Sequence, residues 1–364
     1  MSELIPARPR SPGSVLKREL ETRGWSQKDL AQILGRPAQV ITEIVRGTKQ
    51  ITPDTALELA EALGTTARFW TSLETEYRLC LAQSRRTAGS VIERRAKIFE
   101  ILPVSELVRR GWIKGSRDVD ELQQQVFAFL KVSSFEEEPR LAASYRRSAD
   151  SEDVAAAQRA WLRRVEILAD EQRLTAKFSA SKLRSAIPSL RTLAAQTTGV
   201  AKVPGLLAEH GVRFVVVRHL PKTKVDGAAM YAANHPIVAL TLRYDRIDWF
   251  WFTLMHEVAH VALGHKRGHL DFLDERTTDD EDEAAANEFA SAALLSTDAV
   301  ASFARDQSGL ISRLAVERFA QQLGIHPGIV VGRLHFLGLI PYSHLRGTLE
   351  KVGDYLGRWT DPVT

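Results

Sequence analysis

Residues 248–263 form a predominantly apolar segment whose periodicity predicts a helix, and this segment contains His256, Glu257 and His260. A helix that is apolar on most sides has to be buried, and burying three polar side chains is costly unless each finds a partner. The spacing H-E-x-x-H places both imidazoles on one face, where they can bind one zinc ion, and Glu257 can hold a water beside it. The chain is therefore expected to fold around this helix and to place further polar groups next to it.

A zinc site that keeps one open position needs a third protein ligand. The favoured candidate is Glu283 on a second predicted helix, residues 282–295, where Asn287 lies four residues later on the same face. An asparagine at that position can hydrogen-bond one of the metal histidines. The alternative third ligand is His265, although its spacing places it about 140° around the helix from His260.

If the predicted site is catalytic, it is suited to metal-assisted hydrolysis of an amide bond. Zinc lowers the pKa of water, and Glu257 can take a proton and pass it to the leaving amine. The reaction also needs a group that stabilises the oxyanion or contacts substrate, and Tyr231, His265 and His335 remain equal candidates. The predicted strands before the helix can offer an edge to an extended peptide.

The length of 364 residues and the change of pattern along the chain predict several domains. Residues 1–78 contain five short, well-punctuated helical segments, and residues 79–200 are helical and highly charged. After residue 201, β-branched runs at 212–217 and 237–242 predict strands before the helical pattern returns. The fold class is therefore expected to be multidomain and mainly α, with a helical connector at 79–200 and an α+β domain with a small sheet at 201–364.

Two of the N-terminal segments, 26–34 and 37–46, are predicted to form a helix-turn-helix. Ser26 followed by Asp29 is a capping-box pattern, and Gly35 supplies the short turn. In this motif the second helix enters the major groove of double-stranded DNA, and its early residues meet base edges. The residues expected to face bases or phosphates are Gln27, Ala38, Gln39, Thr42, Glu43, Arg46 and Lys49.

Charge is consistent with a DNA-binding front part. The first 50 residues hold 9 Lys and Arg against 5 Asp and Glu, whereas residues 201–364 hold 17 against 20. The connector has two open interpretations: solvated basic helices, or an extension of the nucleic-acid surface through its arginine pairs. A less favoured alternative is a second DNA-reading helix pair over residues 316–337.

Several classes of protein are not expected. No apolar run approaches the ~20 residues that a membrane-spanning helix needs. The N-terminal residues lack the apolar region of a secretory signal, and the single cysteine, Cys80, cannot form an intrachain disulfide. We therefore expect a cytoplasmic protein without a membrane partner.

Residues 12–79 resemble the HigA-type antitoxin branch of the XRE (Cro/C1-type) regulators. The resemblance lies in W-S-Q-K-D-L-A, in I-T-P-D-T-A-L-E-L-A-E-A-L-G-T and in F-W-T-S-L. It implies a five-helix DNA-binding domain that recognises an operator, and a homodimer.

Residues 205–343 resemble the ImmA/IrrE family of zinc metallopeptidases, through V-D-G-A-A-M-Y, H-E-V-A-H, E-A-A-A-N-E-F-A and G-I-V-V-G-R-L-H. The resemblance implies a zincin-like domain with zinc ligands His256, His260 and Glu283, and Glu257 as catalytic acid and base. Members of that family often show E-x-E-A-N. Here Ala285 stands at the inner glutamate position, so Glu283 aligns with the outer one.

Two functions follow as expectations. The first is a DNA-binding transcriptional regulator with a zinc-dependent endopeptidase domain that cleaves a regulatory protein, which is a repressor, a toxin or the chain itself. The alternative is an antitoxin-like autorepressor of a toxin-antitoxin system, in which zinc is structural or sensory and no proteolysis occurs.

Overall fold

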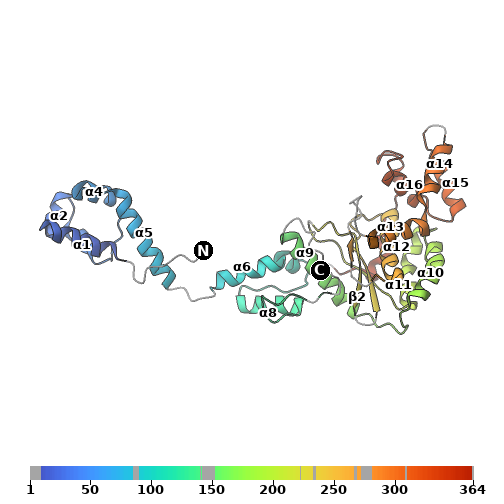
Figure 1. The fold of residues 1–364 in the computed structure, drawn as a ribbon, viewed down its shortest axis with the longest axis horizontal. Helices are drawn as coiled ribbons and strands as arrows, with labels where there is room; N and C mark the ends of the chain where they lie inside the picture. Colours follow the sequence, from blue (N-terminus) through green and yellow to red (C-terminus); the bar gives the residue numbers. More distant parts are fainter. Residues whose placement is uncertain are drawn as a thin grey trace. The chain divides into compact units, whose positions relative to one another are not determined.

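The computed structural model describes residues 10–84, 90–139, 141, 152–221, 223–232, 235–265, 269–271, 281–307 and 310–362. The chain divides into two units, residues 1–91 and residues 92–364 (Figure 1). The expected multidomain, mainly helical fold with a small sheet is confirmed. Among the described residues, no helix is both long and apolar enough to cross a membrane.

The first unit contains the five predicted helices. Their bounds are α1 (Pro12–Arg23), α2 (Gln27–Ile33), α3 (Ala38–Val45), α4 (Pro53–Leu63) and α5 (Ala67–Ser84). The capping box at the start of α2 is present, since Ser26 Oγ accepts from the Asp29 N–H and the Asp29 carboxylate accepts from the Ser26 N–H. Gly24 and Gly64 end α1 and α4 in the left-handed conformation.

The core of this unit is formed by one apolar stripe from each helix, closed by the fully buried Trp70. Gly13 lies against the end of α3, where a Cβ would overlap the carbonyl oxygens of Ile44 and Val45. The absence of a side chain therefore lets α1 cross α3 at close range, which fixes the base of the helix-turn-helix.

The second unit is built on a four-stranded sheet with the strand order β1-β3-β2-β4. Strands β1 and β3 are parallel, and β2 is antiparallel to both of its neighbours. The bounds are β1 (Arg213–Val216), β2 (Gly227–Ala232), β3 (His235–Leu240) and β4 (His269–Asp271).

Both faces of this sheet are covered by helices, which explains the continuous apolar run in β1. Phe214 and Val216 point into one apolar core, and Val215 and Val217 point into another on the opposite face. The first core is covered by α10 (Ala180–Leu193), α11 (Val203–Glu209), α12 (Ile247–Leu263), α13 (Glu281–Leu294), α14 (Thr297–Asp306), α15 (Arg313–Leu323) and α16 (Pro327–Phe336).

The second core is covered by helices of the predicted connector, which are α6 (Val91–Ile101), α7 (Val104–Arg109), α8 (Val119–Leu130) and α9 (Glu152–Asp170) (Figure 1). The expected boundaries at residues 78 and 200 thus differ from the observed division after residue 91. The connector is an integral layer of the second unit because Trp161 and Val165 of α9 are buried against the strands. Trp161 also donates its indole N–H to the Val217 carbonyl at 2.8 Å.

The outer edge of β1 is closed by the chain itself. The Gln172 side chain donates to the Phe214 carbonyl at 2.7 Å and accepts from the Phe214 N–H at 3.3 Å. Thr360 forms a parallel bridge with Val216, whose carbonyl accepts from the Asp361 N–H at 2.7 Å. This edge is therefore not available to another chain.

Two strands and one helix form from sequences that do not favour them locally. Strand β2 was not predicted because G-A-A-M-Y-A lacks β-branched residues, and β4 lies in a charged segment. Pro188 lies inside α10, where a proline removes one backbone hydrogen bond of the helix. The apolar face of α10, with Leu183 and Leu190 fully buried, keeps the helix continuous across the proline.

Candidate metal centre and helix-turn-helix

Helix α12 carries three polar residues into the interior of the second unit. It packs against the sheet, α10, α13 and α16, and its exposed fractions are 1% for His256, 0% for Glu257 and 0% for His260. The helix ends at Gly264 in the left-handed conformation, one turn after His260. The metal-binding pattern therefore lies at the buried C-terminal end of this helix.

The structure brings His256, His260 and Glu283 together. The Nε2 atoms of the two histidines lie 3.0 Å apart, and the Glu283 carboxylate lies 3.2 Å from His256 Nε2 and 3.6 Å from His260 Nε2. Two atoms bound to one tetrahedral zinc, each at ~2.0–2.1 Å, are about 3.4 Å apart. The three donor atoms thus have the mutual spacing that one zinc ion requires, and among the described residues they form the cluster suited to a metal ion.

Asn287 lies behind His256, as the helix spacing predicts. Its Oδ1 is 3.0 Å from His256 Nδ1, so this nitrogen donates and His256 Nε2 keeps its lone pair for a metal. Ala285 lies about 200° around α13 from Glu283 and faces away from this pair. The outer glutamate position, not the inner one, is directed toward the histidines.

His265 lies on the far side of His260 from the donor cluster. Its Nδ1 is 2.9 Å from His260 Nδ1, and its Nε2 is 3.5 Å from the Asp282 carboxylate. His265 therefore contacts the nitrogen of His260 that does not point toward Glu283. This arrangement suits a residue that orients His260 rather than a third ligand.

The other two candidates for an oxyanion or substrate contact lie in different places. The hydroxyl of Tyr231 on β2 is 3.5 Å from the His260 carbonyl, and burial raises the pKa of this phenol. His335 on α16 lies 2.8 Å from the His344 carbonyl through Nε2, and burial lowers its pKa. His335 lies near Asp248 of α12. Asp248 precedes His256 by two turns, about 12 Å along the helix axis, so His335 lies away from the metal ligands.

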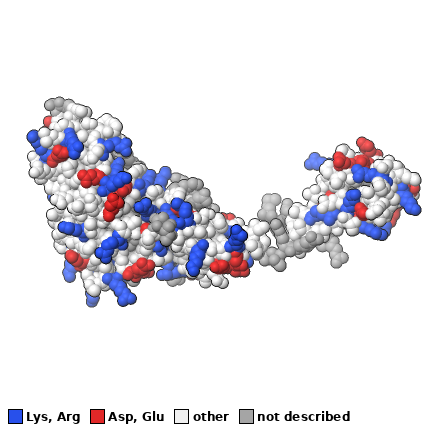
Figure 2. Space-filling model, turned by 180° about the vertical axis from the view of Figure 1, so that it is seen from behind, with Lys and Arg blue, Asp and Glu red and all other residues white. Residues whose placement is uncertain are grey.

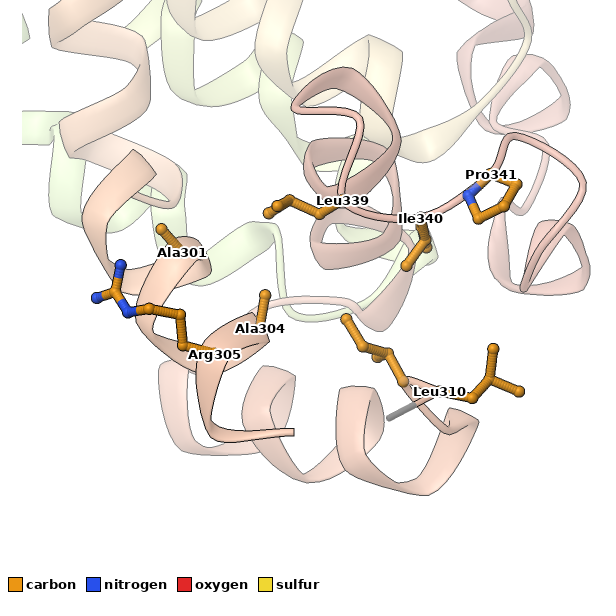
Figure 3. Close-up of a pocket in the computed structure, with 8 residues that line it drawn as sticks. Ala301, Ala304, Arg305, Leu310, Leu339, Ile340 and Pro341 are labelled. Carbon is orange, nitrogen blue, oxygen red and sulfur yellow. The ribbon is translucent and has the colours of Figure 1, made fainter. Parts of the chain in front are cut away.

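A pocket is formed by apolar side chains of α14, the segment before α15 and the segment after α16, with Arg305 at its rim (Figure 3). Its lining residues are Ala301, Ala304, Arg305, Leu310, Ile311, Leu339, Ile340 and Pro341. None of them belongs to the metal cluster, so this pocket is separate from the candidate centre.

In the first unit, α2 and α3 form the predicted helix pair. Ala38 and Gln39 at the start of α3 are exposed, and Thr42 and Glu43 one turn later are half-buried. Thr42 Oγ1 donates to Gln27 Oε1 at 3.0 Å, and Gln39 Nε2 donates to Glu43 Oε1 at 2.9 Å. The first bond joins α3 to α2, and the second lies within α3.

Arg46 and Lys49 are exposed at the end of α3 and in the following turn. This turn is held from α5, because Arg78 donates to the Gly47 carbonyl at 3.2 Å and pairs with Glu74 at 2.7 Å. The two basic residues are therefore presented on a fixed turn.

The described members of the connector arginine pairs bond to other groups of the second unit. Arg163 is buried with Glu166, and Arg164 pairs with Asp361 at 2.6 Å. Arg94 pairs with Asp120, whereas residues 85, 86, 146 and 147 lie outside the described part of the chain. Figure 2 shows basic and acidic groups intermixed on both units, which gives no one-signed stripe in that view. In the helix pair α15–α16, Ile329, Val330 and Val331 of α16 are fully buried, so the early turns of this helix are covered by the rest of the unit.

Asp226 and Gly227 belong to the V-D-G-A-A-M-Y motif, and the sequence alone indicates no role for either residue. Asp226 is buried and accepts from the indole N–H of Trp249 at 3.1 Å. Gly227 begins β2 directly against Glu257 and Thr253. The signal available in the sequence was an acidic residue beside a glycine in an apolar stretch, which indicates a close backbone approach.

Comparison with known proteins identifies the two units separately. A helix-turn-helix family model matches residues 16–70, and the model of the IrrE N-terminal-like domain matches residues 211–335. The chain is 37% identical over 82 residues to virulence-associated protein I of Dichelobacter nodosus, covering 22% of this chain and 76% of that protein. It is 36% identical over 73 residues to an uncharacterized HTH-type transcriptional regulator of Haemophilus influenzae, covering 20% of this chain and 68% of that protein.

Two solved structures are similar over the first unit. One is an addiction module antidote protein of the HigA family from Coxiella burnetii, with 39% identity, a TM-score of 0.21 and coverage of 21% of this chain and 86% of that chain. The other is the Pseudomonas aeruginosa antitoxin HigA with the higBA promoter, with 36% identity, a TM-score of 0.21 and coverage of 21% and 85%.

Proposed function

We propose that this chain is a DNA-binding regulator with a zinc-dependent endopeptidase. The chain belongs to the XRE-type helix-turn-helix family through its first unit and carries an IrrE-like domain in its second. The observation that carries the proposal is the cluster of His256, His260 and Glu283, with Glu257 buried beside it. A spacing close to that of tetrahedral zinc, together with an adjacent carboxylate, suits metal-assisted amide hydrolysis.

Each residue has a separate role in this proposal. The two histidines and Glu283 hold zinc, which when bound polarises the scissile carbonyl and lowers the pKa of water. Glu257 accepts a proton from the attacking water and returns it to the leaving amine. The Tyr231 phenol stays protonated because burial raises its pKa, so it can donate a hydrogen bond to the developing oxyanion.

The proposed substrate is an extended segment of a regulatory protein, which is a repressor, a toxin or a second copy of this chain. An extended peptide binds well along the edge of a sheet. The β1 edge is closed by Gln172 and Thr360, and β2, which carries Gly227 and Tyr231, lies on the other side of β3. We therefore infer that substrate binds on the β2–β4 side of the sheet.

We infer that the first unit binds double-stranded operator DNA as a homodimer, with the start of α3 in the major groove.

Lys49 contacts phosphate in this proposal, so Lys49→Ala should weaken binding to all sequences and reduce the slope of log K against log salt by about 1. Gln39→Ala should instead reduce discrimination between operator and non-operator DNA. Fluorescence anisotropy at several salt concentrations measures both effects, and an unchanged salt slope for Lys49→Ala would exclude its phosphate contact.

The peptidase is tested by incubating the zinc-loaded full-length chain with the products of its neighbouring genes and with itself. Mass spectrometry of fragments should show one defined cut, which Glu257→Gln removes because the proton acceptor is lost. Glu288→Gln, at an exposed position on α13, is the matched control and should cleave normally.

The alternative function predicts a different result from the same pair of variants. An antitoxin-like autorepressor with a structural or sensory zinc would bind its promoter and neutralise a co-encoded toxin equally well with Glu257→Gln. Full neutralisation without any fragment would replace the peptidase proposal by this one.

A further inference from the structure

Gly227 lies closer to the proposed catalytic carboxylate than any residue with a side chain can. A Cβ at Gly227 would overlap Glu257 Oε1 and come within 2.9 Å of both Glu257 Cδ and Thr253 Cγ2. Gly227 is not among the residues with a left-handed φ, so the conformational freedom of glycine is not what this position uses. What the position requires is the absence of a side chain, because the Glu257 carboxylate occupies that space.

The approach of β2 to α12 is fixed by the residue that precedes Gly227. The preceding residue, Asp226, accepts from Trp249 Nε1 at 3.1 Å, and its carbonyl accepts from the Thr241 N–H at 3.0 Å. Trp249, Thr253 and Glu257 follow one another at intervals of four residues and line one side of α12. The first contacts Asp226 and the other two contact Gly227, so the strand and the helix are held in one register.

We propose that Gly227 is a positioning residue that sets where the Glu257 carboxylate lies, with Asp226 holding the strand at that distance; its consequence for catalysis rests on the proposed peptidase function. An added methyl group at residue 227 pushes the carboxylate away from the strand. A displacement of about 1 Å at a reacting group can cost about 100-fold in rate. The three atoms nearest to such a methyl group belong to Glu257 and Thr253, and none of them belongs to a metal ligand.

The kinetic test compares Gly227→Ala with Gly205→Ala in the zinc-loaded full-length chain. Gly205 lies on α11, where a Cβ meets no atom within 4 Å, so it is a matched control. We expect Gly227→Ala to lower kcat about 100-fold while KM and the affinity for zinc, measured by chelator competition, change less than about threefold. Gly205→Ala should leave all three unchanged. A normal kcat for Gly227→Ala, or a kcat loss fully explained by lost zinc, would overturn the proposal.

A second measurement does not depend on any activity. Thermal unfolding is followed for the four chains that combine Gly227→Ala with Glu257→Ala, each in the absence of added metal. Gly227→Ala should lower the midpoint of the second unit by roughly 5 °C in the parent chain. In the Glu257→Ala background the carboxylate is gone and the same change should cost clearly less, with a residual effect from Thr253.

The unfolding midpoints of these four chains separate the positioning role of Gly227 from the proposed peptidase function. If Gly227→Ala alone does not fold, the double variant should fold, which supports the same contact. Equal losses in both backgrounds would overturn the positioning role. A smaller loss from Gly227→Ala in the Glu257→Ala background, in a chain that cleaves no peptide, would support the contact between Gly227 and the carboxylate. It would exclude only the peptidase function.

Discussion

At the scale of single residues, the candidate centre depends on which nitrogen of each histidine is free to bind. Asn287 Oδ1 can only accept, so its 3.0 Å contact makes His256 Nδ1 the donor and directs the Nε2 lone pair toward Glu283. Nδ1 of His260 lies 2.9 Å from His265 Nδ1, so this ring too is held from the side away from Glu283. Asn287 on α13 and His265 just after the end of α12 thus orient the two imidazoles before any metal arrives, which is how such centres reach high affinity.

Asn287→Ala should therefore weaken zinc binding by about 10–100-fold, because His256 loses the acceptor that fixes its tautomer and ring orientation. Competition with a chromogenic chelator measures the change. Glu288→Ala, one residue along α13 and exposed, should bind zinc like the parent chain. Equal affinity for Asn287→Ala and the parent would show that the asparagine does not orient a ligand.

At the scale of elements, helix caps decide where segments begin, and the cap of α16 is a histidine. His326 is the N-cap of α16, and its Nδ1 accepts from the Gly328 N–H at 3.0 Å. Burial lowers the pKa of His326 from its ordinary value of 6.5, against the opposing effect of Glu350, whose carboxylate lies 3.5 Å from Nε2. The neutral ring is therefore the form that the folded helix prefers.

This cap predicts a pH dependence of stability. Because the folded pKa lies below the unfolded one, the unfolded chain binds the proton more readily, and stability is lost as pH falls below about 6.5. His326→Asn keeps an accepting side chain at the cap without titrating, so it should flatten the decline in unfolding free energy between pH 7 and pH 5. Urea unfolding at each pH measures this. A variant with the same decline as the parent would assign the dependence to other histidines, such as His219 and His335.

At the scale of the whole molecule, the second unit is three layers deep, and its C-terminal residues join two of them. The buried Asp361 accepts from Trp112 Nε1 and pairs with Arg164, both on the connector side, while its N–H bonds to β1. Through its carboxylate and its backbone N–H, Asp361 thereby adds a link between the connector and the sheet to the one that Trp161 makes with Val217. Removing one partner of a buried ion pair leaves the other without compensation.

Asp361→Ala should destabilise the second unit by about 3 kcal/mol, since Arg164 and Trp112 both lose their acceptor. Differential scanning calorimetry of the full chain should show the transition of the second unit at a lower temperature and that of the first unit unchanged. Asp354→Ala, at an exposed position, is the control. A shift in both transitions, or in neither, would contradict this assignment.

Much of the fold could be read from local patterns. The five N-terminal helices, the capping box at Ser26 and the long apolar helix depend on residues within a few positions of one another, and the structure has them where the periodicity predicted. The two histidines on one face of α12 are local in the same sense. The family of each unit was also recognisable from its motifs.

The remaining features were decided by contacts between residues far apart in the chain. Whether residue 283 or 285 faces the histidines depends on how α13 packs on α12, and no periodicity in α12 contains that information. The connector became a layer of the second unit because its apolar faces find the sheet, and β2 formed from weak strand formers because it lies between two partners. By itself the sequence determined its helices and the spacing of its histidines, since these are short-range. Only tertiary structure decided which side chains surround them, because packing brings together groups that local chain geometry leaves independent.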